Sequence, residues 1–552
     1  MSQLGNGKRV VAVGLDSADY TLVQKWVASG ELPEIADLFA QSAHGKITGA
    51  SGYTAETPWT VFLTGCWPET TGYWSPGKFH VDYKVEEVEA YRYESFGHFY
   101  DYCAGRKVVA FDVPHARVSQ RVDGVQIMAW GAHSPQGPSQ SLPASELDRI
   151  IADFGEHPAL HNDNILVWET DQRKDTLEQD LIEGIQRRTR AALSLMSSKP
   201  WDLFLLVYGE VHSAGHGMWH LSQNDHPLYP HYADQAHDPM LEVYKEMDRA
   251  IGVLRRALPP DAYLVLFSQE GMKSNSADLP SWLFLPELMH RYSFEGRAAL
   301  ANGEAGELPP PYSKLPAKEW MRAVWGLRES ANPITRFADR NLRLRLSRMV
   351  DKLFASPDEL RHPLDCDVYS YMPQLWYQPL WPRMKAFALP SFSEGNVRIN
   401  VKGRERQGLV APEDFEKTCD EIIALVGTLI NPRNGRPILR EVLRQRTNPF
   451  QNTKGPDADL IFLWDYEPTD VVDSAEFGRI GPAPFRRTGD HYNLGFYCVA
   501  GPGVRPGELA DGELVDLAPT ILELLDVPKP NHFNGQSRTS DIIEPFVAAS
   551  RR

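Results

Sequence analysis

Two histidines four residues apart directly follow an apolar run, and this spacing could hold a metal ion. Residues 201–207 are rich in branched and aromatic side chains, which is typical of a buried strand. A helical turn starting there would project His212 and His216 from one face. Glu210 is close enough to add an oxygen ligand, orient a ring or carry a proton. Capping of the strand-to-helix turn is the simpler alternative, but the combination favours a metal.

Two further predicted strands also end in polar side chains. Residues 8–15 form a mostly apolar run that ends at Asp16, and residues 261–267 lead into Gln269 and Glu270. Open α/β sheets place their sites at the carboxyl ends of parallel strands, so we expect these groups near Glu210. For Asp16, capping of the next helix is an equally simple role.

Candidate nucleophiles lie at the opening of the helix predicted after residue 57. Thr54 and Thr57 carry hydroxyl groups there, and a helix N-terminus together with a nearby cation can stabilise an alkoxide. Ordinary helix capping by either threonine is the alternative. The segment alone does not decide between these two roles.

Composition limits the possible partners. The chain has 552 residues and a net charge of −16, which argues against a nucleic-acid groove and against binding to anionic lipid. An anionic substrate would then need local positive charge, and metal ions are the obvious source. The five cysteines show no metal-binding or disulfide spacing, and no leader or membrane-spanning run is visible. A cytoplasmic protein is the expectation, and the sequence gives no oligomeric state.

The order of predicted elements indicates an α/β fold. Strands alternate with amphipathic helices, which favours a mostly parallel central sheet flanked by helices. Residues 131–164 are predicted to form a loop. Residues 276–390 differ in composition from the segments before and after them, with Pro-rich turns and Arg-rich helices. They are predicted to be an inserted helical cap. Residues 1–275 and 391–552 would then form the α/β catalytic core.

In combination and order, these pieces resemble the alkaline phosphatase superfamily, specifically its type I phosphodiesterase/nucleotide pyrophosphatase branch. The motifs that carry the resemblance are Val13-Gly-Leu-Asp16, the turn at 30–33, Pro58-Trp-Thr-Val-Phe-Leu-Thr-Gly65, His216 to Trp219, Ser268-Gln-Glu-Gly-Met272, Gly489-Asp-His491 and Val515-Asp-Leu-Ala-Pro-Thr520. The resemblance implies a central sheet, two catalytic metal ions that are often zinc, and a phosphorylated Thr or Ser nucleophile. It also implies that His212, His216 and His491 form the first metal site.

The chain departs from the family pattern at three points. His212 replaces an Asp of the first site. Asp16 matches the second site, but its usual Asp-His pair reads Gln269 and Glu270. The nucleophile register falls on Ala55, one residue after Thr54. The three imidazoles suit zinc, with Mn or Fe as alternatives, and one or two ions per chain are possible.

Three functions remain open from the sequence. The first is a metal-dependent hydrolase of phosphate esters, in which a metal activates a threonine or a bound water. The second is a divergent enzyme with a His-rich mononuclear site that performs lyase or oxidative chemistry. The third is a non-catalytic relative. In the enzymatic cases we expect the substrate to be a small organic anion.

Overall fold

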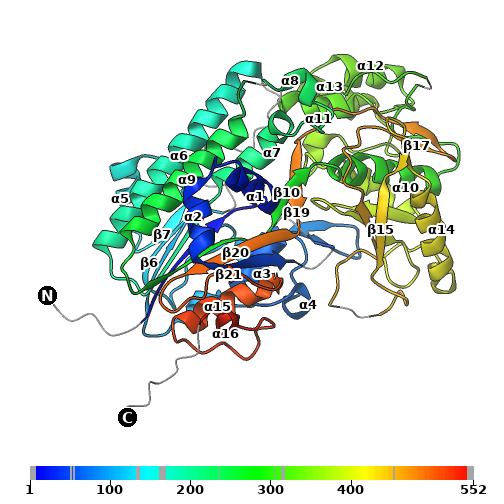
Figure 1. Cartoon of the computed structure of the whole chain (residues 1–552). Helices are drawn as coiled ribbons and strands as arrows, with labels where there is room; N and C mark the ends of the chain where they lie inside the picture. Colours follow the sequence, from blue (N-terminus) through cyan, green and yellow to red (C-terminus); the bar gives the residue numbers. More distant parts are fainter. Residues whose placement is uncertain are drawn as a thin grey trace, which may run out of the picture.

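The central feature of the computed structural model is a ten-stranded sheet (Figure 1). The structure describes residues 8–49, 52–53, 56–131, 137–160, 170–234, 236–304, 306–311, 317–451 and 454–543. The strands of the sheet are β1 (Arg9–Leu15), β2 (Ala43–Thr48), β5 (Lys107–Phe111), β6 (Asp123–Met128), β7 (Gln140–Leu142), β8 (Leu203–Tyr208), β9 (Ala262–Ser268), β20 (Leu494–Ala500), β21 (Gly507–Glu508) and β22 (Gly512–Glu513).

The middle of this sheet is parallel. Its order is β21-β2-β20-β9-β1-β8-β5-β6-β7, with β22 beside β2, and the run from β9 to β6 is parallel throughout. The strand β20 pairs antiparallel with β9, and β7 pairs antiparallel with β6. The α/β class and the mostly parallel sheet are confirmed. The carboxyl ends of β9, β1, β8 and β5 therefore meet at one edge.

Helices cover both faces of the sheet and bury its apolar side chains (Figure 1). One face packs against α1 (Tyr20–Ala28), α2 (Pro33–Gln41), α5 (Ser145–Phe154), α6 (Thr170–Ser198), α7 (Glu210–Ser222) and α9 (Pro239–Ala257). The other face packs against α3 (Glu56–Thr64), α15 (Leu517–Leu524) and α16 (Thr539–Ile542). The helix α5 falls inside residues 131–164, so the prediction of a loop there was wrong for part of that range. The apolar side of α5, including Ile150, packs against the sheet and supplies the reason.

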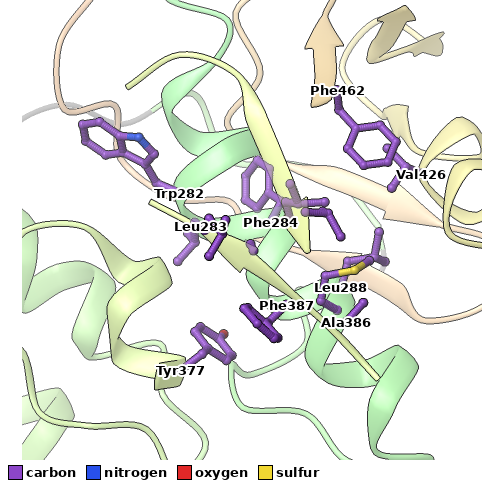
Figure 2. Packing of buried hydrophobic residues seen from close by; sticks show 14 of the residues in the cluster. Trp282, Leu283, Phe284, Leu288, Tyr377, Ala386, Phe387, Val426 and Phe462 are labelled. Carbon is purple, nitrogen blue, oxygen red and sulfur yellow. The ribbon is translucent and has the colours of Figure 1, made fainter. Parts of the chain in front are cut away.

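A second region has its own sheet and core. Its four-stranded sheet has the order β11 (Ala386–Leu389), β12 (Gly395–Ile399), β16 (Leu460–Trp464) and β15 (Leu439–Arg444). The helices of this region are α10 (Leu285–Ser293), α11 (Ala317–Trp325), α12 (Pro333–Asn341), α13 (Leu344–Phe354) and α14 (Phe415–Gly427). Figure 2 shows Phe284, Phe387 and Phe462 packed in its core.

The predicted boundary between residues 390 and 391 lies between two paired strands. The strands β11 and β12 pair antiparallel across it, and buried side chains continue on both sides. The division of the chain into core and cap at this residue stays a prediction. A further four-stranded sheet has the order β14 (Arg436–Pro437), β13 (Ile430–Asn431), β17 (Val472–Ser474) and β18 (Gly478–Ile480). Smaller elements are the strand pair β3 (Gly77–Phe79) and β4 (Val85–Glu87) and the short helices α4 (Pro68–Thr71) and α8 (Tyr229–Tyr232). Among the described residues, no helix is both long and apolar enough to span a membrane.

A two-stranded ribbon joins the two regions next to the carboxyl edge of the main sheet. It consists of β10 (Gly271–Ser274), which follows β9, and β19 (Gly489–Tyr492), which precedes β20. Pairing brings His491 opposite Met272. The ribbon therefore carries a late segment of the chain to the end of β9.

Candidate metal centre

Three imidazoles from distant parts of the chain converge beside the carboxyl edge. His212 and His216 lie one turn apart on α7, and their Nε2 atoms are 2.8 Å apart. The His491 ring lies 5.0 Å from the His212 ring and 4.9 Å from the His216 ring, centroid to centroid. One ligand atom from each residue lies within 4.8 Å of the others. In the described part of the chain, this is the one group of three or more residues arranged to hold a metal ion.

Each imidazole has an acceptor on its Nδ1 side. His212 Nδ1 lies 3.2 Å from Asp16 Oδ2, and His491 Nδ1 lies 2.7 Å from Glu270 Oε1. His216 Nδ1 lies 2.8 Å from the Gly489 carbonyl oxygen. A ring that donates its Nδ1 proton presents the Nε2 lone pair, and metal-binding histidines are usually oriented by such acceptors. The donor set therefore fits a divalent transition metal.

The pKa values of the imidazoles respond to burial and to these carboxylates. Burial lowers the pKa of His212, although Asp16 opposes the shift. Burial also acts to lower the pKa of His491, but the Glu270 carboxylate outweighs it and raises the pKa. A cation favours the deprotonated form of its ligands, so metal binding would release protons here.

The groups expected to form a second metal site instead bond to one another and to the imidazoles. Asp16 Oδ1 accepts from Gln269 Nε2 at 2.7 Å and from Trp59 Nε1 at 2.9 Å. Glu270 accepts from the His491 ring and from Ser17 Oγ, the latter at 3.2 Å. Two N–H donors thus satisfy one oxygen of Asp16 without a cation. The role of Asp16, Gln269 and Glu270 as second-site ligands stays a prediction, and their geometry favours orientation of the first site.

The prediction that Glu210 carries a proton or binds the metal stays a prediction, and the surroundings of Glu210 do not favour it. Its Oε1 accepts from Arg188 Nε at 2.9 Å and lies 3.0 Å from His157 Nε2. Burial alone would raise the pKa of Glu210, but Arg188 and His157 outweigh it and the pKa is lowered. Arg188 also binds Asp112 at 2.6 Å. Glu210 therefore belongs to a buried ion-pair network and not to the imidazole group.

The structure describes one of the two candidate nucleophiles, Thr57. The Thr57 hydroxyl is buried on α3 and donates to the Trp74 carbonyl oxygen at 3.0 Å. This bond directs the hydroxyl toward backbone, so the geometry does not favour Thr57 as a nucleophile. Thr54 lies outside the described residues, and its role as nucleophile stays a prediction.

Three residues near the site were not identified from the sequence. Arg487 Nη1 lies 3.1 Å from His216 Nε2, and its guanidinium is fixed by Asp278 and Asp490 at 2.8–3.0 Å. Such a guanidinium can stabilise an anionic oxygen at the edge of the imidazoles. Its position four residues before His491 was the only available signal.

Ser17 is the second of these residues. It is fully buried with φ of 53°, a left-handed conformation that is uncommon for non-glycine residues. Its Oγ lies 3.3 Å from His491 Nδ1 and 3.5 Å from Asp16 Oδ1. Ser17 therefore lies between the carboxylates of Asp16 and Glu270. In the sequence, only its place directly after Asp16 could have indicated this role.

His115 is the third. It is buried with φ of 57°, and its Nδ1 lies 3.6 Å from Glu56 Oε2. Burial lowers the pKa of His115 to about 3, while Asp16 opposes the shift. Burial raises the pKa of Glu56 to about 7, and the Tyr73 hydroxyl donates to this carboxyl group at 2.9 Å. A neutral imidazole thus lies near His212 and His491, with a weakly acidic carboxyl group on its other side.

Comparisons with known proteins identify relatives of this chain. The sequence model of the type I phosphodiesterase/nucleotide pyrophosphatase family matches residues 10–359. One similar solved structure is murine ectonucleotide pyrophosphatase/phosphodiesterase 5 in an inactive form with AMP, at 13% identity and a TM-score of 0.44, covering 95% of this chain and 96% of that chain. Another is phosphonoacetate hydrolase from Sinorhizobium meliloti with phosphonoformate, at 10% identity and a TM-score of 0.47, covering 94% and 95%. A search of curated protein sequences found no match.

Proposed function

Because the chain belongs to the type I phosphodiesterase/nucleotide pyrophosphatase family, a family of metal-dependent hydrolases, we propose that it hydrolyses a phosphodiester or related phosphate ester of a small organic anion. The observation that carries the proposal is the convergence of three imidazoles, each with an acceptor on Nδ1. We propose zinc as the metal, since tetrahedral nitrogen sites suit it. One ion per chain is favoured because the described residues offer one such group.

Residues around the imidazoles support chemistry at phosphorus. A bound divalent ion would polarise a phosphoryl oxygen and stabilise charge that develops in an in-line displacement. Arg487 would supply a second positive charge from a fixed position. Asp16 and Glu270 would hold two of the imidazoles in orientation. Thr54 remains the proposed side-chain nucleophile.

An aromatic pocket supports an organic substituent on the substrate. It has a volume of about 210 Å³ and is lined in part by Tyr53, Tyr73, Trp74, Tyr93 and Phe392. Pockets of this composition favour flat apolar groups with a few polar contacts. The net charge of −16 makes the local cations necessary for any anionic substrate.

The test is turnover of 4-nitrophenyl phenyl phosphate by protein loaded with zinc, manganese or iron. We expect chelator to stop turnover and His491→Ala to lower kcat/KM by more than about 100-fold, beyond what loss of an orienting group costs. Elemental analysis should show bound metal in the wild type and its loss in the variant. The exposed His231, changed to Ala, is the matched control. Absence of turnover of any aryl phosphodiester by metal-loaded protein would contradict the proposal.

A further inference from the structure

A small recess borders the imidazole group on the side of the second region. We name it the cationic recess and define it by Tyr53, Lys273, Arg440, Tyr466, His491 and Tyr492, which line it together with Glu394 and other residues. Its volume is about 100 Å³. The recess therefore has room for one phosphate- or carboxylate-sized group.

Lys273 enters the recess from the ribbon that carries His491. It lies on β10 opposite Asp490 of β19, one position away from the pair formed by Met272 and His491. Neighbouring residues along a strand face opposite sides, so Lys273 and His491 project to different faces of the ribbon. The Lys273 side chain therefore does not share the point on which the three imidazoles converge.

Aromatic rings surround the Lys273 ammonium. Its Nζ lies 4.4 Å from the centre of the Tyr466 ring and 5.8 Å from that of Tyr492. Among the described residues, no carboxylate forms an ion pair with Lys273 within 4.0 Å. Asp490 lies opposite Lys273 on the ribbon, but its carboxylate binds Arg487 and Ser393. Contact with aromatic faces stabilises the charge only in part.

Arg440 brings a second positive charge to the same ring. Its Cζ lies 5.0 Å from the centre of the Tyr466 ring. The Arg440 guanidinium also forms a 3.6 Å ion pair with the Glu441 carboxylate. Two cations on one aromatic ring repel each other. Burial lowers the pKa of Lys273 and Arg440 adds to the shift, while the carboxylates of Asp490, Glu394 and Asp465 oppose it. Glu394 also lines the recess, so its carboxylate offsets part of this positive charge. An anion entering here would relieve the repulsion.

We propose that Lys273 and Arg440 bind a second anionic group of the substrate, a carboxylate or a phosphate that is not the group attacked. This inference rests on the proposed function and names the substrate class more closely. The recess shares Gly52, Tyr53 and Glu394 with the aromatic pocket, so the two cavities adjoin. One substrate can thus place its organic part in the aromatic pocket and its second anion on Lys273.

The experiment compares two diesters that differ by one charge, 4-nitrophenyl phenyl phosphate and 4-nitrophenyl 4-carboxyphenyl phosphate. We expect wild-type protein to show a kcat/KM about 10-fold or more higher for the carboxylate-bearing diester, as a charge-assisted contact provides. Lys273→Gln and Arg440→Gln should each reduce this preference while changing kcat/KM for the uncharged-ring diester by less than about 3-fold. Lys417→Gln is the matched control, because the Lys417 side chain is 75% exposed on α14.

A second readout separates this inference from the proposed function. Ligand-observed NMR in the presence of chelator measures binding of both diesters without turnover. If neither diester is hydrolysed but wild-type protein still binds the carboxylate-bearing one more tightly and Lys273→Gln does not, the proposed function fails and the recess assignment stands. Equal binding and equal turnover of the two diesters by wild-type protein would overturn the recess assignment alone. Equal losses for both diesters in Lys273→Gln would also overturn it.

Discussion

The carboxyl edge of the central sheet has two halves that use the same residue types differently. The half formed by β9 and β1 ends in Glu270 and Asp16, whose carboxylates contact imidazole Nδ1 atoms. The half formed by β8 and β5 ends in Glu210 and Asp112, whose carboxylates share the guanidinium of Arg188. All four carboxylates are buried. The strands are neighbours in one parallel sheet, so position along the edge does not explain the difference.

The partner of each carboxylate decides what it can do. Arg188 is permanently charged and binds both carboxylates, so these two groups are already paired within the protein. An imidazole that donates Nδ1–H to a carboxylate keeps a lone pair on its other nitrogen, and this nitrogen can bind a metal ion. One half of the edge is thus an internal ion-pair network, and the other half can bind a ligand.

The largest effect should come from breaking the ion-pair half. Arg188→Leu would leave Asp112 and Glu210 buried without their cation, and such a loss typically lowers the free energy of unfolding by about 3–5 kcal/mol. Metal stoichiometry of the folded protein should stay unchanged, because Arg188 contacts none of the three imidazoles. Urea denaturation and elemental analysis measure the two quantities. Arg190→Leu is the matched control, since Arg190 is exposed on the same helix. Loss of metal from folded Arg188→Leu protein would show that the two halves are coupled.

A smaller effect should follow from changing the imidazole half. Glu270→Gln keeps the shape of the side chain but weakens the contact with His491 Nδ1, so the metal Kd should rise about 10–100-fold. The free energy of unfolding in chelator should change less than in Glu210→Gln, which weakens the pairing with Arg188. Competition with a chromogenic chelator measures the Kd. If Glu210→Gln weakened metal binding as much as Glu270→Gln, the division of the edge would be wrong.

The fold was accessible from the sequence because strand periodicity is local. The apolar runs at residues 8–15, 201–207 and 261–267 correspond to β1, β8 and β9. The spacing of His212 and His216 was equally local, since about 40° separates two residues four apart on a helix. The contacts of Glu210 lie outside the imidazole group because about 200° separates it from His212 on the same helix, which turns it toward α6.

The remaining features depend on contacts that no local pattern encodes. The partner of Glu210 is Arg188, 22 residues away along the chain, and the partner of His491 is Glu270, in the bend between β9 and β10. Arg487 reaches His216 only because β19 pairs with β10. Pairing of β11 with β12 across residue 390 likewise depends on folding of the second region.

The smallest predicted effect concerns His115, which lies near the junction of the two halves. It lies three residues after Asp112, in the segment that follows β5, yet the charges of Asp16, His212 and His491 contribute to the pKa of its imidazole. Burial lowers its pKa from 6.5 to about 3, so the folded protein keeps this ring neutral while the unfolded chain binds a proton below pH 6.5. The unfolded state therefore gains protons on acidification, and stability falls as the pH drops below 6.5.

Between pH 7.5 and pH 5.5, His115 should contribute about 1.4 kcal/mol to the loss of unfolding free energy. His115→Gln should reduce that loss by this amount, whatever it does to stability at pH 7.5, because glutamine does not titrate. Urea denaturation in chelator at the two pH values measures the difference without a contribution from metal release. His231→Gln, at an exposed position on α8, should leave the loss unchanged. An unchanged loss in His115→Gln would mean that this ring is protonated in the folded protein and pairs with Asp16 or Glu56, which would extend the imidazole half of the edge to β5.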